Sequence, residues 1–83
     1  MQNYRIIYED AAREDLDELP ERQAAQIVKK IARLQHGLHG DIKRLQNHDF
    51  SYRLRMGDFR ILFDVVRDDI VIQRIKDRKD AYN

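Results

Sequence analysis

Three arginines stand close together between Phe50 and Phe63, in a stretch that reads FSYRLRMGDFRILF. Polar and apolar residues alternate on both sides of a Gly-Asp pair, which is the pattern of a β-hairpin with a two-residue turn. In such a hairpin Arg55 lies directly opposite Arg60, and Arg53 lies two residues further along the same face. Like charges placed opposite each other destabilise a ladder by up to about 1 kcal/mol. A guanidinium cluster kept at that cost favours a phosphate ligand, whose oxygens match arginine donors in charge and geometry.

The composition limits the kind of protein and of site that the chain can form. Eighty-three residues make one small domain, residues 1–83, too short for two hydrophobic cores. There are no cysteines, and three histidines without further ligands at metal spacing predict neither a metal site nor another cofactor. No signal peptide or membrane span is recognisable, which predicts a cytoplasmic protein with no membrane partner. The formal net charge is only +1, so the local arginine cluster, rather than bulk charge, is the signal for a phosphate ligand.

The elements that must hold the cluster in place follow from the same kind of pattern. Residues 10–19 and 21–38 carry apolar side chains at helical spacing and predict a helical hairpin with one apolar side. Residues 4–8 and 70–75 predict strands before the helices and after the β-hairpin, and residues 41–49 predict a linking loop. The order β-α-α-β-β-β predicts an α+β domain, with the helical hairpin packed on one face of a small twisted antiparallel sheet.

Strict alternation divides the strand residues between the two faces of that sheet. One face is apolar and suits the helices, while the other mixes basic and apolar side chains and is compatible with a bound base and phosphate or with plain solvent. Predicted to point away from the helices are Arg53, Arg55, Arg60, Leu62, Gln73 and Ile75. Arg74 falls on the helix side, where we expect it to pair with an acidic residue of the first helix, and we expect Asp64 to pair with Arg60.

Taken along its whole length, the chain resembles the RelE/ParE toxins of bacterial and archaeal toxin–antitoxin systems. The resemblance rests on a KRLQ loop, the hairpin YRLRMGDFRILF, the strand IVIQRI and the tail DRKDAY. It implies the RelE-like fold and a growth-arresting toxin. It also implies a cognate RelB-like antitoxin with an acidic amphipathic segment, and operator DNA that is bound through this antitoxin.

The two branches of the family differ in what they attack. RelE-branch toxins are ribosome-dependent endoribonucleases that cut mRNA in the decoding site, whereas ParE-branch toxins poison DNA gyrase. The RelE-branch site, carried over by position, corresponds to Arg53, Arg55, Arg60, Arg78 and Tyr82. ParE-branch proteins usually lack the full basic set and the terminal tyrosine, so the resemblance favours the ribonuclease, with the ribosome and mRNA as partners. A gyrase inhibitor and a catalytically attenuated RelE relative are the alternatives.

Metal-free RNA cleavage needs a base for the 2′-OH, cations around the phosphorane and an acid for the 5′-oxygen. Arginines meet the second need, but a guanidinium is a poor base because its pKa lies above about 12. Where the family has a histidine before the tail arginine this chain has Asp77, so we expect Asp77 or Tyr82 to assist the 2′-OH, with His48 as a further candidate. The residues expected to bind RNA or rRNA are Arg53, Lys43, Arg44, Lys76, Lys79 and His48.

Overall fold

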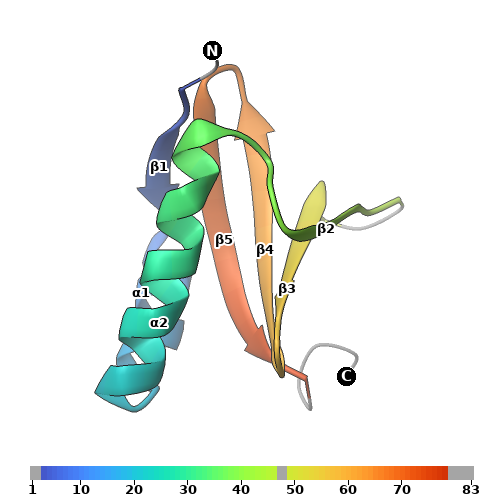
Figure 1. Ribbon diagram of the computed structural model, residues 1–83. Coiled ribbons are helices and arrows are strands. Elements are labelled where there is room, and N and C mark those ends of the chain that lie inside the picture. The colour runs from blue at the N-terminus through green and yellow to red at the C-terminus, as the bar shows by residue number, and fades with distance from the viewer. Residues whose placement is uncertain (1–2, 47–48, 79–83) are drawn as a thin grey trace.

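The computed structural model describes residues 3–46 and 49–78, and Figure 1 shows two helices lying on one face of a sheet. The elements are β1 (Arg5–Tyr8), α1 (Asp10–Asp17), α2 (Glu21–Ala32), the 3₁₀ turn η1 (Arg33–His36), β2 (Asp41–Arg44), β3 (Tyr52–Met56), β4 (Phe59–Val66) and β5 (Asp69–Asp77). Within these residues the sheet has five strands in the order β1-β5-β4-β3-β2, and β1 runs parallel to β5 while the other neighbours are antiparallel. The α+β class is therefore confirmed, although the sheet is mixed rather than antiparallel.

The hydrophobic core lies between the two helices and the inner face of the sheet. α2 begins directly after Pro20, whose fixed φ suits a helix start, and it buries Ile27 and Ile31. The buried apolar side chains of the sheet are Leu54, Ile61, Phe63, Ile70, Ile72 and Ile75, which are all at most 5% exposed. Burying one such side chain contributes about 1.5–3 kcal/mol, so this core decides which face of each strand points inward.

The hairpin between β3 and β4 has the register that the Gly-Asp pair predicts. Met56 pairs with Phe59, Arg55 with Arg60, and the two strands are joined through Gly57 and Asp58. Gly57 has a φ of 56°, in the left-handed region that glycine adopts without steric cost. The predicted pairing of Arg55 with Arg60 is therefore confirmed.

A β-bulge in β5 changes the faces that alternation assigns. Phe63 pairs with Ile72 but Leu62 pairs with Arg74, so Gln73 is an extra residue on β5. From that point the strand is out of phase with simple alternation. Ile75, predicted to point away from the helices, is 5% exposed in the core, so that prediction is wrong.

Two further differences concern the middle of the chain. Residues 41–44, predicted as part of a loop, form the edge strand β2, which pairs with β3. The second helix ends at Ala32, and η1 continues to His36 before Gly37 with a φ of 138°. No helix in the described part of the chain is long and apolar enough to cross a membrane.

Candidate functional site

The outer face of the sheet, away from the helices, carries a row of three cationic side chains, which we call the cation row. Arg55 on β3 pairs with Arg60 on β4, and Arg60 pairs with Lys76 on β5. Neighbouring strands lie about 4.8 Å apart, so three long basic side chains rise from backbone positions spanning only about 10 Å. Such a concentration of positive charge suits an anionic ligand with several oxygens, such as a phosphate.

A second row lies beside the first. Lys43 on β2 pairs with Arg53 on β3, and Arg53 pairs with Leu62, which pairs with Arg74. Arg53 is partly neutralised because its Nη2 lies 3.5 Å from Oδ1 of Asp41. The sequence prediction that Arg53, Arg55 and Arg60 share one face is thus confirmed, and Lys43 lies in register with them.

Arg60 is the most enclosed member of the cation row, with 6% of its surface exposed. Its Nη1 donates hydrogen bonds to the carbonyl oxygens of Gly57 at 2.9 Å and Phe59 at 3.1 Å, which orients the guanidinium against the hairpin turn. The buried Nε atoms of Arg60 and Arg53 have no hydrogen-bond partner among the residues that the structure describes. A buried donor left unpaired costs about 1–3 kcal/mol, which an oxygen of a bound phosphate would recover.

Arg44 does not join this face. It pairs with Tyr52, whose ring stacks on the core residue Phe63, and the Arg44 guanidinium lies 5.9 Å from the centroid of the Tyr52 ring. Because Tyr52 points toward the helices, Arg44 lies on the side of the sheet opposite Arg53. The RNA-binding role predicted for Arg44 stays a prediction, for a side chain on the face opposite the hairpin arginines.

Asp77, which the sequence suggested as an aid to the 2′-OH, lies in register on the face of the sheet opposite the cation row. Its Cα is opposite that of Phe59, which packs against the core, so the register directs Asp77 toward the helix side. It lines a cleft at the edge of β5 together with Glu18, Leu19 and Lys76. The prediction that Asp77 stands beside the arginine cluster is wrong because the bulge at Gln73 places Lys76, not Asp77, in line with Arg60.

The remaining predicted site residues are Arg78, the last described residue, and three that lie outside the described ranges. The backbone N–H of Arg78 donates to the carbonyl oxygen of Asp58 at 2.6 Å, which brings the exposed Arg78 next to the hairpin turn. Arg78 is thus close to the end of the sheet that carries the cation row. His48, Lys79 and Tyr82 lie outside the described residues.

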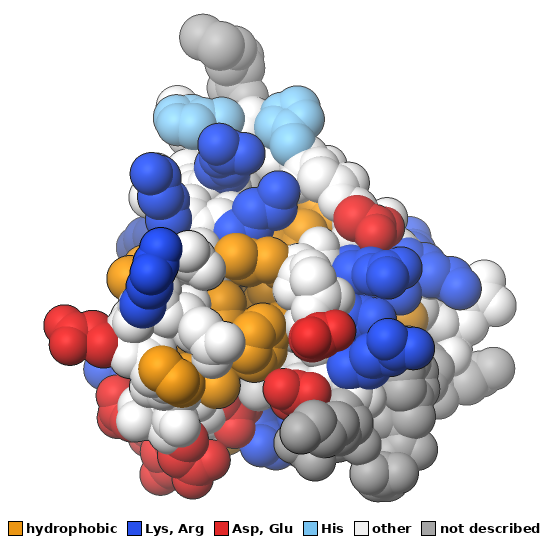
Figure 2. All heavy atoms as spheres, turned by 60° about the horizontal axis from the view of Figure 1, so that its bottom comes forward, with side chains coloured by type: hydrophobic (Ala, Val, Ile, Leu, Met, Phe, Trp, Pro, Cys, Tyr) orange, Lys and Arg blue, Asp and Glu red, His pale blue; other side chains and the backbone are white. Residues whose placement is uncertain are grey.

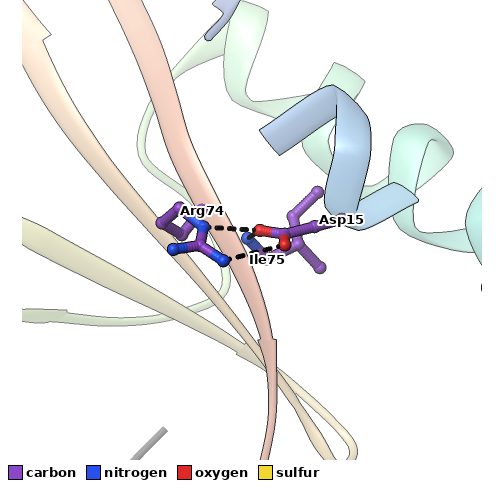
Figure 3. A network of polar contacts seen from close by, with 3 residues as sticks. All are labelled: Asp15, Arg74 and Ile75. Atoms are coloured by element: carbon purple, nitrogen blue, oxygen red, sulfur yellow. Dashed lines mark hydrogen bonds and ion pairs between the residues drawn. The ribbon is translucent and has the colours of Figure 1, made fainter. Parts of the chain in front are cut away.

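Arg74 forms a paired network with α1, drawn in Figure 3. Its Nε and Nη2 donate to the two carboxylate oxygens of Asp15 at 2.8 and 3.0 Å, and the Ile75 N–H donates to Oδ2 of Asp15 at 2.8 Å. Burial acts to raise the pKa of Asp15, but the bonds from Arg74 and Ile75 outweigh it and hold that pKa below its ordinary value. Pairing with Asp15 correspondingly raises the pKa of Arg74. The prediction that Arg74 pairs with an acidic residue of the first helix is confirmed. Asp15 also accepts the hydrogen bond of a β5 backbone N–H that lies beyond the residues paired with β1.

Asp64 has a different role from the one predicted. Its Oδ1 accepts a hydrogen bond from the Ser51 N–H at 2.8 Å, and its Oδ2 accepts one from Nε2 of Gln73 at 3.1 Å. The carboxylate therefore ties the start of β3 to the bulge of β5, and the prediction that it fixes Arg60 is wrong. Alternation places Asp64 and Gln73 on one face, but it gives no reason to prefer Gln73 to Arg60 as the partner of Asp64.

On the other face of the sheet, a groove separates α2 from the β-hairpin. Two adjoining hollows of about 280 Å³ each form it, and they share Gln26 and Met56 as lining residues. Figure 2 shows apolar side chains at the bottom of this groove, with basic side chains along one side and acidic ones near the other. The residues that line it are Gln23, Gln26, Ile27, Lys29, Lys30, Arg33, Met56, Gly57, Asp58 and Phe59.

The sequence model of a family described as "ParE toxin of type II toxin-antitoxin system, parDE" matches residues 6–82. The chain belongs to this toxin family. Two relatives of Methanocaldococcus jannaschii match parts of it: "Putative toxin RelE1" is 48% identical over 44 residues and "Toxin RelE3" is 37% identical over 43 residues. These matches cover 51% and 52% of this chain, and each spans 49% of the relative. The match thus covers about half the length of each curated relative.

Solved structures of family members have the same fold. The toxin of a RelB–RelE complex from Methanococcus jannaschii superposes with a TM-score of 0.75 and 28% identity, covering 92% of this chain and 94% of that one. A chain of the RelBE2 toxin–antitoxin complex from Mycobacterium tuberculosis superposes with a TM-score of 0.81 and 27% identity, covering 96% and 97%. This family member therefore has the RelE fold along nearly its whole length.

Proposed function

We propose that this family member is a ribosome-dependent endoribonuclease that cuts mRNA in the decoding site and so inhibits translation. The observation that carries the proposal is the cation row, in which Arg55, Arg60 and Lys76 stand in register on one face. A row of like charges weakens the sheet, which makes sense if a polyanion binds there. The low net charge of +1 fits docking in a defined ribosomal cleft better than binding to free RNA.

In this proposal the arginines supply electrostatic stabilisation of the transition state. Arg60, fixed by its bonds to the turn carbonyls, and Arg55 beside it contact the non-bridging oxygens of the scissile phosphate as negative charge develops there. Arg78, held next to Asp58, closes the same end of the site. We assign the activation of the 2′-OH to Tyr82 rather than to Asp77, because Asp77 lies opposite the inward-facing Phe59 in the strand register.

We also propose that a cognate antitoxin occupies the groove between α2 and the hairpin. The related toxins from Methanococcus jannaschii and Mycobacterium tuberculosis were solved as complexes with their antitoxins. The groove has an apolar floor and Lys29, Lys30 and Arg33 along the α2 side, which suits an acidic amphipathic segment. Binding of operator DNA is then a property of the complex with the antitoxin.

The test is 5′-end mapping of a translated reporter mRNA after brief induction of the toxin in cells. The parent is compared with the double variant Arg60→Ala/Arg78→Ala and with a control, Arg13→Ala/Arg22→Ala, which removes the same charge from exposed positions on the helices. We expect new 5′ ends in frame with the codons in the parent and the control, and none in the double variant or when translation is blocked. In-frame cuts that persist in Arg60→Ala/Arg78→Ala would contradict the proposal.

A second candidate is inhibition of DNA gyrase, since the matched family model carries the ParE name. This candidate needs no catalytic row and assigns toxicity to the helical hairpin. It predicts growth arrest without new mRNA ends, retained in Arg60→Ala/Arg78→Ala and lost in Arg13→Ala/Arg22→Ala. The same experiment therefore separates the two candidates, and absence of both arrest and cuts would indicate an attenuated relative.

A further inference from the structure

Lys76 occupies the end of the cation row, in a position that simple alternation assigns to the opposite face. The bulge at Gln73 shifts the last residues of β5, so Lys76 pairs with Arg60 while its neighbour Ile75 is buried in the core. Lys76 therefore rises from the outer face, one strand from Arg60 and two strands from Arg55. It is half-buried there, at an edge of β5 that β1 no longer covers.

The two arginines of the cation row do not supply a proton for the 5′-oxygen that leaves in RNA cleavage. An RNA 5′-oxygen leaves as an alkoxide and requires a proton, but an arginine guanidinium does not give up its proton in proteins. A lysine ammonium carries its proton at neutral pH and can pass it to an alkoxide, which is a far stronger base. Among the described residues of the cation row, Lys76 is the member that can transfer a proton.

Asp15 lies within electrostatic range of Lys76, since the Lys76 charge is one of the influences that lower the Asp15 pKa. Both oxygens of Asp15, however, already accept hydrogen bonds from Arg74 and from the Ile75 amide at 2.8–3.0 Å. Lys76 therefore acts on this carboxylate through its charge, while the hydrogen bonds that Asp15 accepts come from Arg74 and Ile75.

We propose that Lys76 is the general acid that protonates the 5′-oxygen leaving group, an inference that rests on the proposed ribonuclease function. In the step, the 2′-oxygen bonds to phosphorus, its proton passes to solvent through the base, and the bond from phosphorus to the 5′-oxygen breaks. Nζ of Lys76 gives a proton to that oxygen and later regains one from solvent. The products are a 2′,3′-cyclic phosphate and a 5′-OH end.

The experiment uses purified toxin and ribosomes carrying an mRNA with the mapped cut site. Lys76→Arg keeps the positive charge but removes the transferable proton, so we expect its cleavage rate to fall by about 10²–10⁴-fold, the usual contribution of a general acid. Arg13→Lys is the matched control: it exchanges the same two basic side chains at an exposed position of α1, and we expect the variant to cut at the parent rate.

A second mRNA decides between proton transfer and a merely structural role. It carries sulfur in place of the 5′-bridging oxygen at the cut site, and a thiolate leaves without needing a proton. We expect Lys76→Arg to cut this mRNA within a few-fold of the parent. Equal losses on the oxygen and sulfur mRNAs, or parent-like cutting of the oxygen mRNA by Lys76→Arg, would overturn the assignment. If the parent cuts neither mRNA, the proposed function itself fails and the assignment falls with it.

Discussion

Arg74 and Arg60 lie in adjacent rows on one face of the sheet, and their surroundings differ in kind. Arg74 is bound by both oxygens of Asp15, and this pair fixes α1 to the edge of β5 (Figure 3). Arg60 is 6% exposed, stands between two other cations, and donates only to carbonyl oxygens among the contacts within the described chain. An arginine that serves the fold receives a carboxylate, whereas one kept for a ligand leaves its charge uncompensated.

The cation row and the Arg74–Asp15 pair should differ most in how a substitution changes mRNA cleavage, and the largest loss is expected in the cation row. Arg55→Met should lower ribosome-dependent mRNA cleavage by about 10²–10³-fold, because it removes a cation placed to stabilise the developing charge. The free energy of unfolding should stay close to the parent value, since a like-charge pair with Arg60 and an opposite-charge pair with Asp41 disappear together. Single-turnover cleavage and urea unfolding measure the two quantities. Arg13→Met, at an exposed position of α1, is the control and should leave both unchanged.

The Asp15 network should behave in the reverse way. Asp15→Asn removes the negative charge that pairs with Arg74 and replaces one of the two acceptor oxygens by an NH2 group, so we expect the free energy of unfolding to fall by about 2 kcal/mol. Urea unfolding measures this loss. Asp17→Asn, at an exposed position of the same helix, serves as the control. An equally small change in both variants would show that the network does not hold α1 on the sheet.

The contribution of Asp15 should also depend on pH in a defined direction. The pKa of Asp15 is lower in the folded protein than its ordinary value of about 3.9, so the carboxylate stabilises the fold fully above that value. The stabilisation is lost as the pH falls through the lower, folded-state pKa. The stability difference between the parent and Asp15→Asn should therefore be constant from pH 7 to about 5 and shrink below about pH 4. A difference that is still undiminished at pH 2 would contradict this assignment.

The smallest effect is expected far from both networks, at the turn between β4 and β5. Arg67 has a φ of 57°, a left-handed conformation that costs a non-glycine residue about 1 kcal/mol. Arg67→Gly should raise the free energy of unfolding by up to about 1 kcal/mol, offset in part by the entropy of glycine in the unfolded chain. Thermal unfolding would detect the change, and a destabilised variant would indicate that the Arg67 side chain makes a compensating contact.

The sequence predicted those parts of the fold and the site that depend on local pattern. The Gly-Asp turn predicted the register of Arg55 and Arg60, and the family resemblance predicted the fold. Charge complementarity was enough to predict that Arg74 pairs with the first helix. The predicted face of Arg74 was wrong, because the strand register pairs Arg74 with Leu62 on the outer face and not on the helix side.

What the sequence analysis missed follows mainly from one bulge. Ile70 and Ile72 keep alternation, but Ile75 is out of phase with them, and this break was the available signal for the extra residue Gln73. Because the bulge was not predicted, Ile75 was placed on the wrong face of the sheet, and so were Lys76 and Asp77. The short edge strand β2 carries a single apolar residue, Ile42, so its pairing with β3 depends on tertiary contact rather than on pattern.

The central claim is that the cation row is kept for a ligand and not for the fold, and the charge-reversal variant Arg60→Glu tests it most directly. A carboxylate at position 60 would stand opposite Arg55 and Lys76, and each opposite-charge pair is worth about 0.2–1 kcal/mol. We predict that urea unfolding finds Arg60→Glu close to the parent in stability, because these pairs offset the lost hydrogen bonds to the Gly57 and Phe59 carbonyl oxygens, while in-frame mRNA cleavage falls by at least about 10²-fold. A variant that is clearly less stable than the parent yet cuts mRNA at the parent rate would contradict the account.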